Sequence, residues 1–323
     1  MDLPQPAVAS PSSGAIGLDI GGTKMAGGVV RLADGVVLAR CLTPTLPKRG
    51  GEAVLADAVG LAGNLIREAK EIGVEIAGIG VAVAELVDLR GIVVSSNSIA
   101  WRDIAVHEQF ARLAPTVVEA DARAAALAEA MFGAGRSFKT FFYITVGTGI
   151  GSCLVEDGRP YAGARGLAGT IASSPMISIC KECGTTSEAV LEELASGPAL
   201  AARYNQRRPG AATRAEDVLA AVAAGDSDAI NVVRSAGELL GGTVGLMVNT
   251  LDPEAVIVGG GLGLAGGLYW DTFVASTRQH IWSDLNRELP ILQAQCGVDA
   301  GIVGAAAAFL GNRITPRAFR PRR

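Results

Sequence analysis

Two stretches of this 323-residue chain repeat one order of elements: an apolar strand, a glycine-rich turn, a second strand and an Asp-Gly turn. The first stretch covers residues 15–40 and contains AIGLDIGG, MAGGVVRL and ADG. The second covers residues 138–161 and reads FKTFFYITVGTGIGSCLVEDGRPY. Apolar runs bounded by glycine turns are typical of β-hairpins. A hairpin repeated in two halves of a chain predicts two related α/β domains with a cleft between them.

The segments around these hairpins supply further helices and strands. Helices are predicted where apolar residues recur with helical spacing or strong helix formers dominate, at residues 50–73, 121–135, most of 188–249, and 301–310. Buried strands are predicted at the continuous apolar runs of residues 75–88, 253–261 and 289–295. Strands that alternate with helices in this way predict the α/β fold class.

Composition excludes several functional classes. The net charge is −4, so the chain has no overall attraction for nucleic-acid phosphates, and the basic end at residues 317–323 is interpreted as a solvated tail. Five cysteines in a chain of this length favour reduced thiols over a disulfide framework. The first residues lack the basic and apolar regions of a signal peptide, and no apolar run reaches the roughly 18 residues of a membrane span. We therefore expect a cytoplasmic protein without nucleic-acid or membrane partners.

The turn of the first hairpin has the composition of a phosphate-binding loop. Asp19 ends the apolar strand, and Gly21 and Gly22 let the backbone turn closely. Thr23 and Lys24 then add a hydroxyl and an ammonium group. Backbone N–H groups in such a turn form a nest for anions, whereas the Asp19 carboxylate would hold Mg²⁺ through water. An ordinary hairpin turn that carries Thr and Lys is the alternative interpretation.

Two later glycine turns suit the same nucleotide. The second hairpin turns at Gly147, Thr148 and Gly149, so two symmetric loops could grip the β- and γ-phosphates from both sides. The strand at 253–261 ends in the triplet Gly259, Gly260 and Gly261, where a flat adenosine could approach the backbone. A plain turn at a strand end is the alternative for this triplet. None of the three loops is a Walker loop or a Rossmann fingerprint.

Together these loops resemble those of the ROK family (repressors, open reading frames and kinases) within the actin-like ATPase superfamily. The resemblance covers nearly the whole chain and rests on six stretches, DIGGTK at 19–24, SNSIAW at 96–101, VEADARAAALAE at 118–129, ITVGTGIG at 144–151, ELASGPAL at 193–200 and VIVGGGLG at 256–263. It implies an actin-like ATPase fold, with an N-terminal α/β domain of residues 1–122 plus 300–323 and a C-terminal α/β domain of residues 123–299. It also implies ATP and Mg²⁺ as cofactors, a sugar as the small-molecule partner, and a homo-oligomer such as a dimer.

The resemblance assigns a catalytic base to the chain. In the family the base aspartate lies in a stretch written VENDANAAALAE, and Asp121 falls on its position. Transfer of a phosphoryl group to a sugar needs an oriented acceptor for the hydroxyl proton. On the residues alone, a helix N-cap is the favoured interpretation of Asp121. The family's repressors carry an N-terminal DNA-binding domain, and the short leader before Asp19 favours the kinase branch instead.

Other positions depart from the family pattern near the sugar. Ala120 stands where an asparagine usually precedes the base, and Thr170-Ile171-Ala172-Ser173 replaces a Glu-x-Gly-His segment. The family's zinc loop retains only Cys180 and Cys183. Two thiolates are too few for a closed structural zinc site, which needs four ligands. Zinc is therefore not expected, and the pair is interpreted as two free thiols near a turn.

Four residues are candidate sugar ligands: Glu85, Asn97, Asp121 and Glu192. Asn97 and Glu192 lie in or beside matched family stretches, although Asn97 is also a common residue of turns. Glu85 occupies a position where relatives usually have glycine. A carboxylate that faced the sugar would suit an ammonium group, and the alternative is a Glu85 side chain in solvent beyond the strand end.

These departures suggest an ATP-dependent kinase that phosphorylates the 6-hydroxyl of an amino hexose such as kanosamine, which is 3-amino-3-deoxyglucose. A glucokinase with a degenerate zinc loop is one alternative. A non-catalytic sugar sensor is the other, and the retention of Asp121 and of all three glycine loops counts against it.

Overall fold

The computed structural model describes residues 13–179 and 186–314, which form two compact units. Unit 1 contains the segments up to residue 136, 158–168, and from residue 295 onward. Unit 2 contains the segments 137–157 and 169–294. The domain bounds predicted at residues 122 and 300 both fall inside unit 1, because the helix that begins at Asp121 packs against the last helix of the chain.

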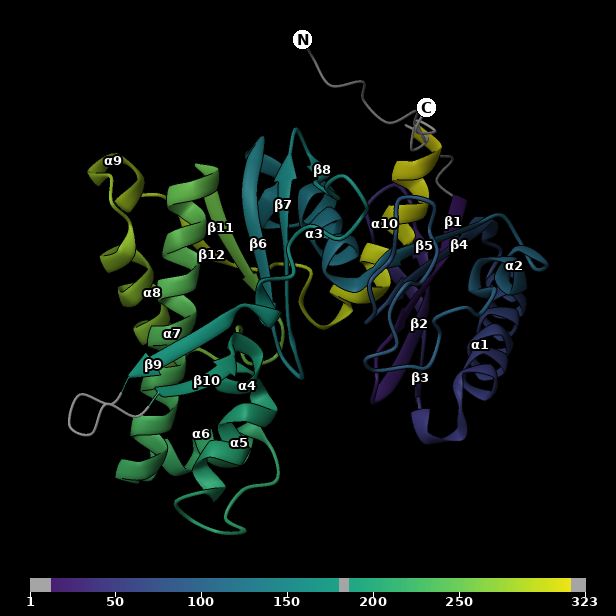
Figure 1. The fold of residues 1–323 in the computed structure, drawn as a ribbon. Coiled ribbons are helices and arrows are strands. Elements are labelled where there is room, and N and C mark those ends of the chain that lie inside the picture. Colours follow the sequence, from purple (N-terminus) through teal and green to yellow (C-terminus); the bar gives the residue numbers. More distant parts are fainter. Residues whose placement is uncertain (1–12, 180–185, 315–323) are drawn as a thin grey trace. The chain divides into compact units, whose positions relative to one another are not determined.

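Unit 1 is built on a five-stranded mixed sheet (Figure 1). Its strands are β1 (Ser13–Ile20), β2 (Lys24–Arg31), β3 (Val37–Pro44), β4 (Glu75–Val83) and β5 (Thr116–Ala120). In the sheet order β3-β2-β1-β4-β5, the first three strands are antiparallel neighbours, and β4 runs parallel to both β1 and β5. The predicted first hairpin is confirmed as β1 and β2, with its turn at residues 21–23.

Helices cover both faces of this sheet (Figure 1). They are α1 (Gly51–Glu71), α2 (Val106–Ala111), α3 (Asp121–Phe132) and α10 (Ala300–Ile314), with 3-10 turns η1 (Pro47–Arg49), η2 (Ala134–Ser137) and η4 (Gly297–Asp299). Successive strand residues point to opposite faces, so Leu18 packs toward α1 while Gly17 lies against α10. Helix α1 ends two residues before Gly73, whose φ of 74° is the left-handed conformation expected of a glycine cap.

Unit 2 contains a second mixed sheet with the strand order β12-β11-β6-β7. Its strands are β6 (Thr140–Val146), β7 (Ile150–Glu156), β11 (Ala255–Gly259) and β12 (Ile291–Gln293); β8 (Arg159–Pro160) follows β7 in the chain. A separate antiparallel ribbon consists of β9 (Pro175–Ile179) and β10 (Thr186–Val190). The prediction of a mixed α/β chain is therefore confirmed in both units.

The helices of unit 2 enclose its hydrophobic core. They are α4 (Leu191–Ala195), α5 (Gly197–Asn205), α6 (Ala215–Ala223), α7 (Ser227–Leu251), α8 (Gly267–His280) and α9 (Asp284–Arg287), with the 3-10 turn η3 (Ile171–Ser173). The long helices α7 and α8 lie side by side (Figure 1), and Leu240 of α7 and Phe273 of α8 belong to one buried cluster. This packing fixes one face of β6 and β11, the strands that lead into the glycine loops.

The two units repeat one local topology. In unit 1, β1 turns into the antiparallel β2 and also pairs in parallel with β4. In unit 2, β6 turns into the antiparallel β7 and also pairs in parallel with β11. In both cases the glycine-rich turn follows the strand that has a parallel neighbour, so each turn lies at the carboxyl end of parallel strands. In open α/β sheets, ligands bind outside the carboxyl ends of parallel strands.

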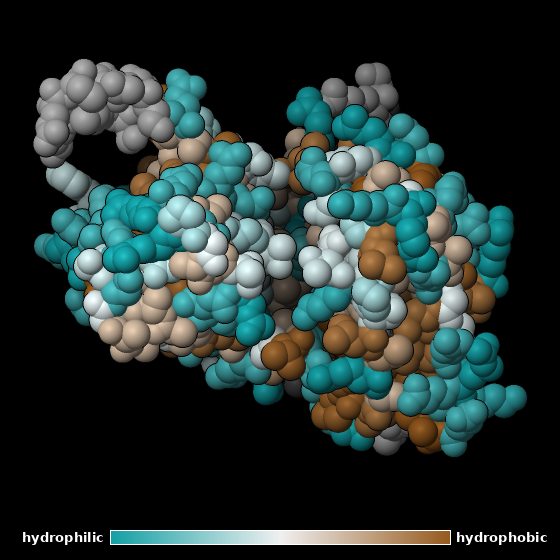
Figure 2. All heavy atoms as spheres, turned by 90° about the horizontal axis from the view of Figure 1, so that it is seen from below, coloured by the Kyte–Doolittle hydropathy of each residue, from teal (hydrophilic) through white to brown (hydrophobic). Residues whose placement is uncertain are grey.

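The surface combines hydrophilic and hydrophobic residues. Figure 2 shows one face, on which hydrophobic side chains (brown) lie among hydrophilic ones (teal). Among the helices that the structure describes, none has both the length and the apolar character that crossing a membrane requires.

Candidate functional site

The turn between β1 and β2 is held in place by Thr45, a residue that the sequence patterns did not single out. The Gly21 N–H donates to the carbonyl of Lys24 at 3.0 Å and closes the turn. Thr45 is fully buried; its hydroxyl donates to the carbonyl of Gly21 at 2.6 Å and its N–H donates to the carbonyl of Thr23 at 3.1 Å. The side chains of Thr23 and Lys24 remain exposed. The backbone of the turn is therefore fixed while its polar side chains are accessible to an anion.

Asp19 lies near the end of β1, against helix α10. A Cβ atom built on Gly301 of α10 would overlap the Asp19 carboxylate, so the helix approaches this side chain at a position without a side chain of its own. Burial raises the pKa of Asp19, and the positive charge of Lys24 partly opposes that rise. A cation bound near Asp19 would therefore stabilise its ionised form.

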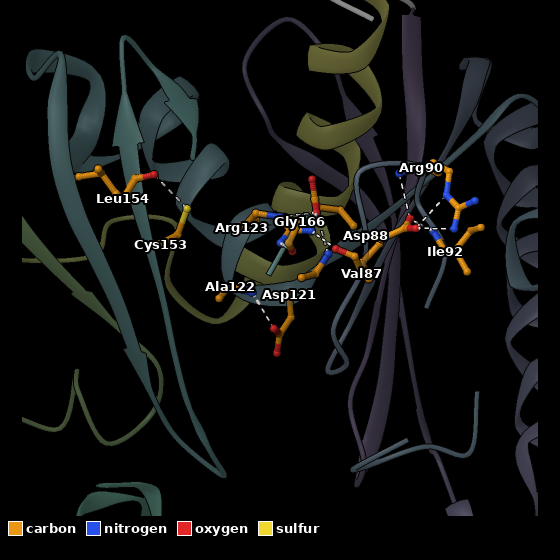
Figure 3. A network of polar contacts seen from close by, with 12 residues as sticks. Val87, Asp88, Arg90, Ile92, Asp121, Ala122, Arg123, Cys153, Leu154 and Gly166 are labelled. Atoms are coloured by element: carbon orange, nitrogen blue, oxygen red, sulfur yellow. Dashed lines mark hydrogen bonds and ion pairs between the residues drawn. The ribbon is translucent and has the colours of Figure 1, made fainter. Parts of the chain in front are cut away.

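Asp121 is the first residue of α3, and the N-cap position belongs to Ala120. One carboxylate oxygen, Oδ1, accepts the N–H of Ala122 at 2.6 Å, and the carboxylate points away from the buried guanidinium of Arg123 (Figure 3). The other oxygen, Oδ2, accepts no hydrogen bond from the described residues. Burial raises the pKa of Asp121 to about 7, with a further contribution from the negative charge of Asp19. This carboxyl group therefore changes its charge near neutral pH and has one oxygen free to accept a proton.

A buried ion pair fixes the start of α3 and with it the Asp121 backbone. Glu119 Oε1 accepts from the Nε of Arg123 at 2.7 Å and from the N–H of Ala120 at 2.9 Å. Arg123 also donates to the carbonyls of Val87, at 2.8 Å, and of Gly166 (Figure 3). Both side chains are almost inaccessible to solvent. Glu119 belongs to β5 and Arg123 to α3, so neither helical spacing nor strand alternation indicates this pair or its two distant carbonyl partners.

The donor set of unit 1 suits a divalent cation with oxygen ligands. Asp19 and Asp121 are close enough for the charge of one to raise the pKa of the other. Two carboxylates that repel each other in a partly buried place are stabilised by a hard cation such as Mg²⁺, which keeps several waters. Within residues 13–179 and 186–314, no three His, Cys, Asp or Glu side chains gather closely enough to form a complete metal site. Such an ion would therefore need further oxygens from a phosphate or water.

Glu85 lies two residues beyond the end of β4 and is only 5% exposed, so the alternative interpretation, a side chain in solvent, is wrong. Its carboxylate accepts hydrogen bonds from the backbone N–H groups of Asn97, Ser98 and Ile99, and from the hydroxyl of Ser95. The loop that carries Asn97 is thus folded around Glu85. The structure brings these two predicted residues together, with Glu85 bonded to the backbone rather than to the side chain of Asn97.

The second glycine turn, in unit 2, is tied to Glu192. The N–H of Gly147 donates to the carbonyl of Gly149 at 2.9 Å, and Thr148 between them is exposed. Glu192 Oε2 accepts the N–H of Ile150 at 2.7 Å, and a Cβ atom on Gly149 would lie only 2.6 Å from this oxygen. Its other oxygen, Oε1, has no hydrogen-bond partner in the described part of the chain. Glu192 therefore positions the turn with one oxygen and has the second available for a ligand.

The third glycine turn lies beside the second within unit 2. Gly259 ends β11, and Gly260 has a φ of 82°, a left-handed conformation that glycine adopts without strain. The N–H groups of Leu262 and Gly263 donate to the carbonyl of Val146, directly before the second turn. A Cβ atom on Gly147 would lie 3.8 Å from the N–H nitrogen of Gly261. Unit 2 thus brings two of the predicted nucleotide loops and Glu192 into one place.

The predicted site residues therefore form two groups, each inside one unit. Unit 1 contains the Asp19–Lys24 turn, the carboxylates of Glu85 and Asp121, and Asn97. Unit 2 contains the turn at residues 147–149, Glu192 and the turn at residues 259–261. The retained thiols Cys180 and Cys183 lie outside the described residues.

Comparison with known proteins gives this arrangement a context. The sequence profile of the ROK family matches residues 15–312. A glucokinase of Streptomyces coelicolor is 33% identical over 314 residues, covering 90% of this chain and 96% of that protein. An N-acetylmannosamine kinase of Escherichia fergusonii is 29% identical over 305 residues, covering 93% of this chain and 99% of that protein. The crystal structure of a ROK family glucokinase from Streptomyces griseus in complex with glucose and AMPPNP superposes with a TM-score of 0.77 at 31% identity, covering 91% of this chain and 98% of that one. These matches confirm the predicted actin-like ATPase fold.

Proposed function

The chain belongs to the ROK family of sugar kinases, and we propose that it transfers the γ-phosphoryl group of ATP to the 6-hydroxyl of a hexose. The observation that carries this proposal is the state of Asp121. This carboxyl group has one oxygen fixed by a backbone N–H, one oxygen free, and a pKa raised to about 7 by burial and by Asp19. A general base is most effective when its pKa lies near the working pH.

Asp121 acts in the proposed reaction as the acceptor of the sugar proton. The 6-hydroxyl donates to the free oxygen Oδ2, and the proton moves to Asp121 as the hydroxyl oxygen bonds to the γ-phosphorus. The bond between that phosphorus and the bridging oxygen breaks, so the products are the sugar 6-phosphate and ADP. The Ala122 N–H holds Oδ1 throughout, which keeps the carboxylate in one orientation. Most of the acceleration in phosphoryl transfer comes from such positioning together with charge stabilisation.

The glycine turns provide the donors for the phosphates in this proposal. The turn at residues 21–23, fixed by Thr45, offers backbone N–H groups and the exposed side chains of Thr23 and Lys24. The turns at 147–149 and 259–261 are the proposed sites for the terminal phosphates and for adenosine. When bound, Mg²⁺ supplies positive charge for the phosphate oxygens, and Asp19 is the residue proposed to hold it through water.

The narrower substrate within the hexoses is an amino hexose such as kanosamine. Ala120 and the segment Thr170–Ser173 support an altered pocket, and one relative is named an N-acetylmannosamine kinase. Glu85 gives no support for an ammonium group on the substrate, because four donors of the chain itself occupy that carboxylate. Glucose is the competing substrate, since the glucokinase relative has the higher identity.

A substrate panel tests both levels of the proposal. Purified protein is incubated with Mg²⁺-ATP and glucose, glucosamine, N-acetylmannosamine or kanosamine, and ADP release is followed together with the mass of the phosphorylated sugar. We expect turnover with at least one hexose, and ¹³C-labelled product places the phosphate on C6. A clear preference for glucose would end the amino-hexose proposal. Sugar binding without any ADP release would favour the sugar-sensor alternative.

The pH dependence of the reaction follows from Asp121. Because its pKa is raised to about 7, the base form is lost as the pH falls through neutrality. The kcat/KM for the sugar, at saturating Mg²⁺-ATP, is expected to be constant above about pH 8 and to fall about tenfold for each pH unit well below 7, since this ratio reports the enzyme before the sugar binds. Initial rates between about pH 5.5 and about pH 9 measure the profile. A profile that is flat down to about pH 5.5 would contradict the role of Asp121 as the base.

A further inference from the structure

The carboxylate of Glu85 is the organising centre of the loop that carries Asn97. Glu85 Oε2 accepts from the Ser95 hydroxyl and, at 2.9 Å, from the N–H of Asn97. Glu85 Oε1 accepts from the N–H groups of Ser98, at 2.6 Å, and Ile99, at 2.8 Å. A carboxylate has about four lone-pair positions, and the loop uses all four. No acceptor capacity remains for a ligand, so a role for Glu85 in the site must be indirect.

Among the described residues, Glu85 is the acceptor for all three N–H groups of Asn97, Ser98 and Ile99. Residues 95–99 belong to no helix or strand, so their N–H groups have no ladder partners. An ionised carboxylate is a strong acceptor for such groups, and its own burial is tolerated only because the donors surround it. The Ser95 hydroxyl also accepts the N–H of Leu86 at 2.8 Å, which links the loop to the residue after Glu85.

A second anchor lies at the far end of the loop. Trp101 is fully buried, and its indole N–H donates to the carbonyl of Gly51, the first residue of α1, at 2.9 Å. Asn97 lies between the two anchors with an exposed side chain, and its amide forms no hydrogen bond with the described residues. A rigid backbone with a free amide is the arrangement that a pre-organised ligand contact requires. The loop also borders the phosphate turn, since a Cβ atom on Gly22 would lie 3.1 Å from the Cβ of Ser98.

We infer that Glu85 is a positioning residue for sugar recognition: it fixes the backbone of residues 95–99 so that the Asn97 amide is held ready for a sugar hydroxyl. This inference rests on the proposed function, in which Asn97 binds the sugar. It replaces a direct contact between Glu85 and the substrate by a contact through the loop. It also explains why a buried carboxylate stands at the end of β4, where it would otherwise be destabilising.

The isosteric variant Glu85→Gln keeps one of the two acceptor oxygens and removes the other. The amide oxygen can remain at the position of Oε1 and keep the N–H groups of Ser98 and Ile99. The amide NH₂ then takes the place of Oε2 and faces the N–H of Asn97, which loses its acceptor. We expect the KM and the calorimetric Kd for the sugar to rise about 10-fold or more. The KM for ATP is expected to stay within about twofold, because the Ser98 side of the loop is retained.

Asp88→Asn is the matched control for this variant. Asp88 Oδ1 accepts the N–H groups of Arg90 and Ile92, both at 2.9 Å, and organises the neighbouring turn (Figure 3). Its carboxylate accepts no hydrogen bond from residues 95–99. We expect its sugar KM to match that of the wild type. If Glu85→Gln does not fold, Ser95→Ala takes its place, because it removes one donor to Oε2, and we expect a smaller rise of about two- to fivefold.

The outcomes distinguish this inference from the proposed function. Wild-type sugar KM and Kd in both loop variants would overturn the inference while leaving the kinase intact. Equal rises of the sugar KM in Asp88→Asn and in Glu85→Gln would overturn it as well. They would reflect a general loosening of residues 85–99 rather than a specific effect on Asn97. If the wild type binds a sugar of the panel without phosphorylating it, the proposed function fails and the Kd comparison still tests the inference. Absence of both binding and turnover with all four sugars would reject both.

Discussion

Replacing Asp121 by Asn is expected to lower kcat by about 10²–10⁴-fold, the range that general acid–base groups contribute. Asparagine keeps the size of the side chain and an oxygen for the Ala122 N–H, but it cannot take the proton of the sugar hydroxyl. The KM values for sugar and ATP should change little, because the geometry is retained. Steady-state kinetics with the best hexose of the panel measures this effect. A kcat within about threefold of the wild type would exclude Asp121 as the base.

The same substitution is expected to lower activity but to raise stability above neutral pH. This gain in stability serves as a control for correct folding of the variant. The pKa of Asp121 is raised to about 7 from an unfolded value of 3.8, so the folded state binds more protons between these two values. Ionisation of Asp121 therefore lowers the free energy of unfolding progressively as the pH rises through this window, and the loss persists above pH 7. Because Asn does not ionise, the variant should have the higher unfolding temperature at about pH 8 and lose this advantage near about pH 4. A lower unfolding temperature at both pH values would show that the substitution disturbs the packing around residue 121, and the lost activity would then not identify the base.

Replacing Gly80 by Ala is expected to destabilise unit 1 by about 3 kcal/mol or more. Gly80 lies on β4 beneath helix α10, and a Cβ atom there would overlap the backbone carbonyl of Ala305. A backbone carbonyl cannot rotate away as a flexible side chain would, so the helix itself must shift. Gly17 on β1 has the same relation to the carbonyl of Ile302. At both glycines the backbone of α10 lies directly on the sheet.

Chemical denaturation measures this effect, with Gly60→Ala as the control. Gly60 is exposed in the middle of α1, and nothing lies within 4 Å of a Cβ atom built on it. Alanine there should stabilise the protein by about 0.5–1 kcal/mol, because it removes backbone freedom from the unfolded chain. Unit 1 and unit 2 need not unfold together, so the midpoint of the earlier transition is the quantity to compare. A wild-type midpoint for Gly80→Ala would contradict the close packing of α10 on β4.

Much of the fold could be predicted from local patterns. The hairpins β1–β2 and β6–β7 and the helix α3 follow from apolar runs, glycine turns and helix formers that lie next to each other in the chain. The three glycine turns were recognisable for the same reason, because each turn needs a particular residue at a particular position. The assignment of Asp121 to the base, by contrast, depended on the resemblance, since an aspartate before an alanine-rich helix has an ordinary capping role.

The contacts that fix the site could not be predicted, because they join residues distant in sequence. Glu85 was recognisable as an unusual charge at a strand end, but its four donors lie 10 to 14 residues later in a loop without periodicity. Thr45 lies 24 residues from the carbonyl of Gly21 that it holds, and a lone threonine after a strand has no distinctive pattern. Arg123 reaches a carbonyl 43 residues away. Hydrophobic patterning determines which face of an element is buried, whereas these polar partners are selected by the completed fold.

The position of α10 has a consequence for biosynthesis. Its Ile302, Ala306 and Phe309 complete a hydrophobic cluster with Ala15 and Val30, which are translated before any segment of unit 2. At about 5–20 residues per second, the nascent sheet waits on the order of tens of seconds for the helix that covers it. The segments of unit 2 are all translated before that helix begins. The sheet of unit 1 is therefore completed only after all of unit 2 has been synthesised, and its uncovered strands are natural targets for chaperones in the meantime.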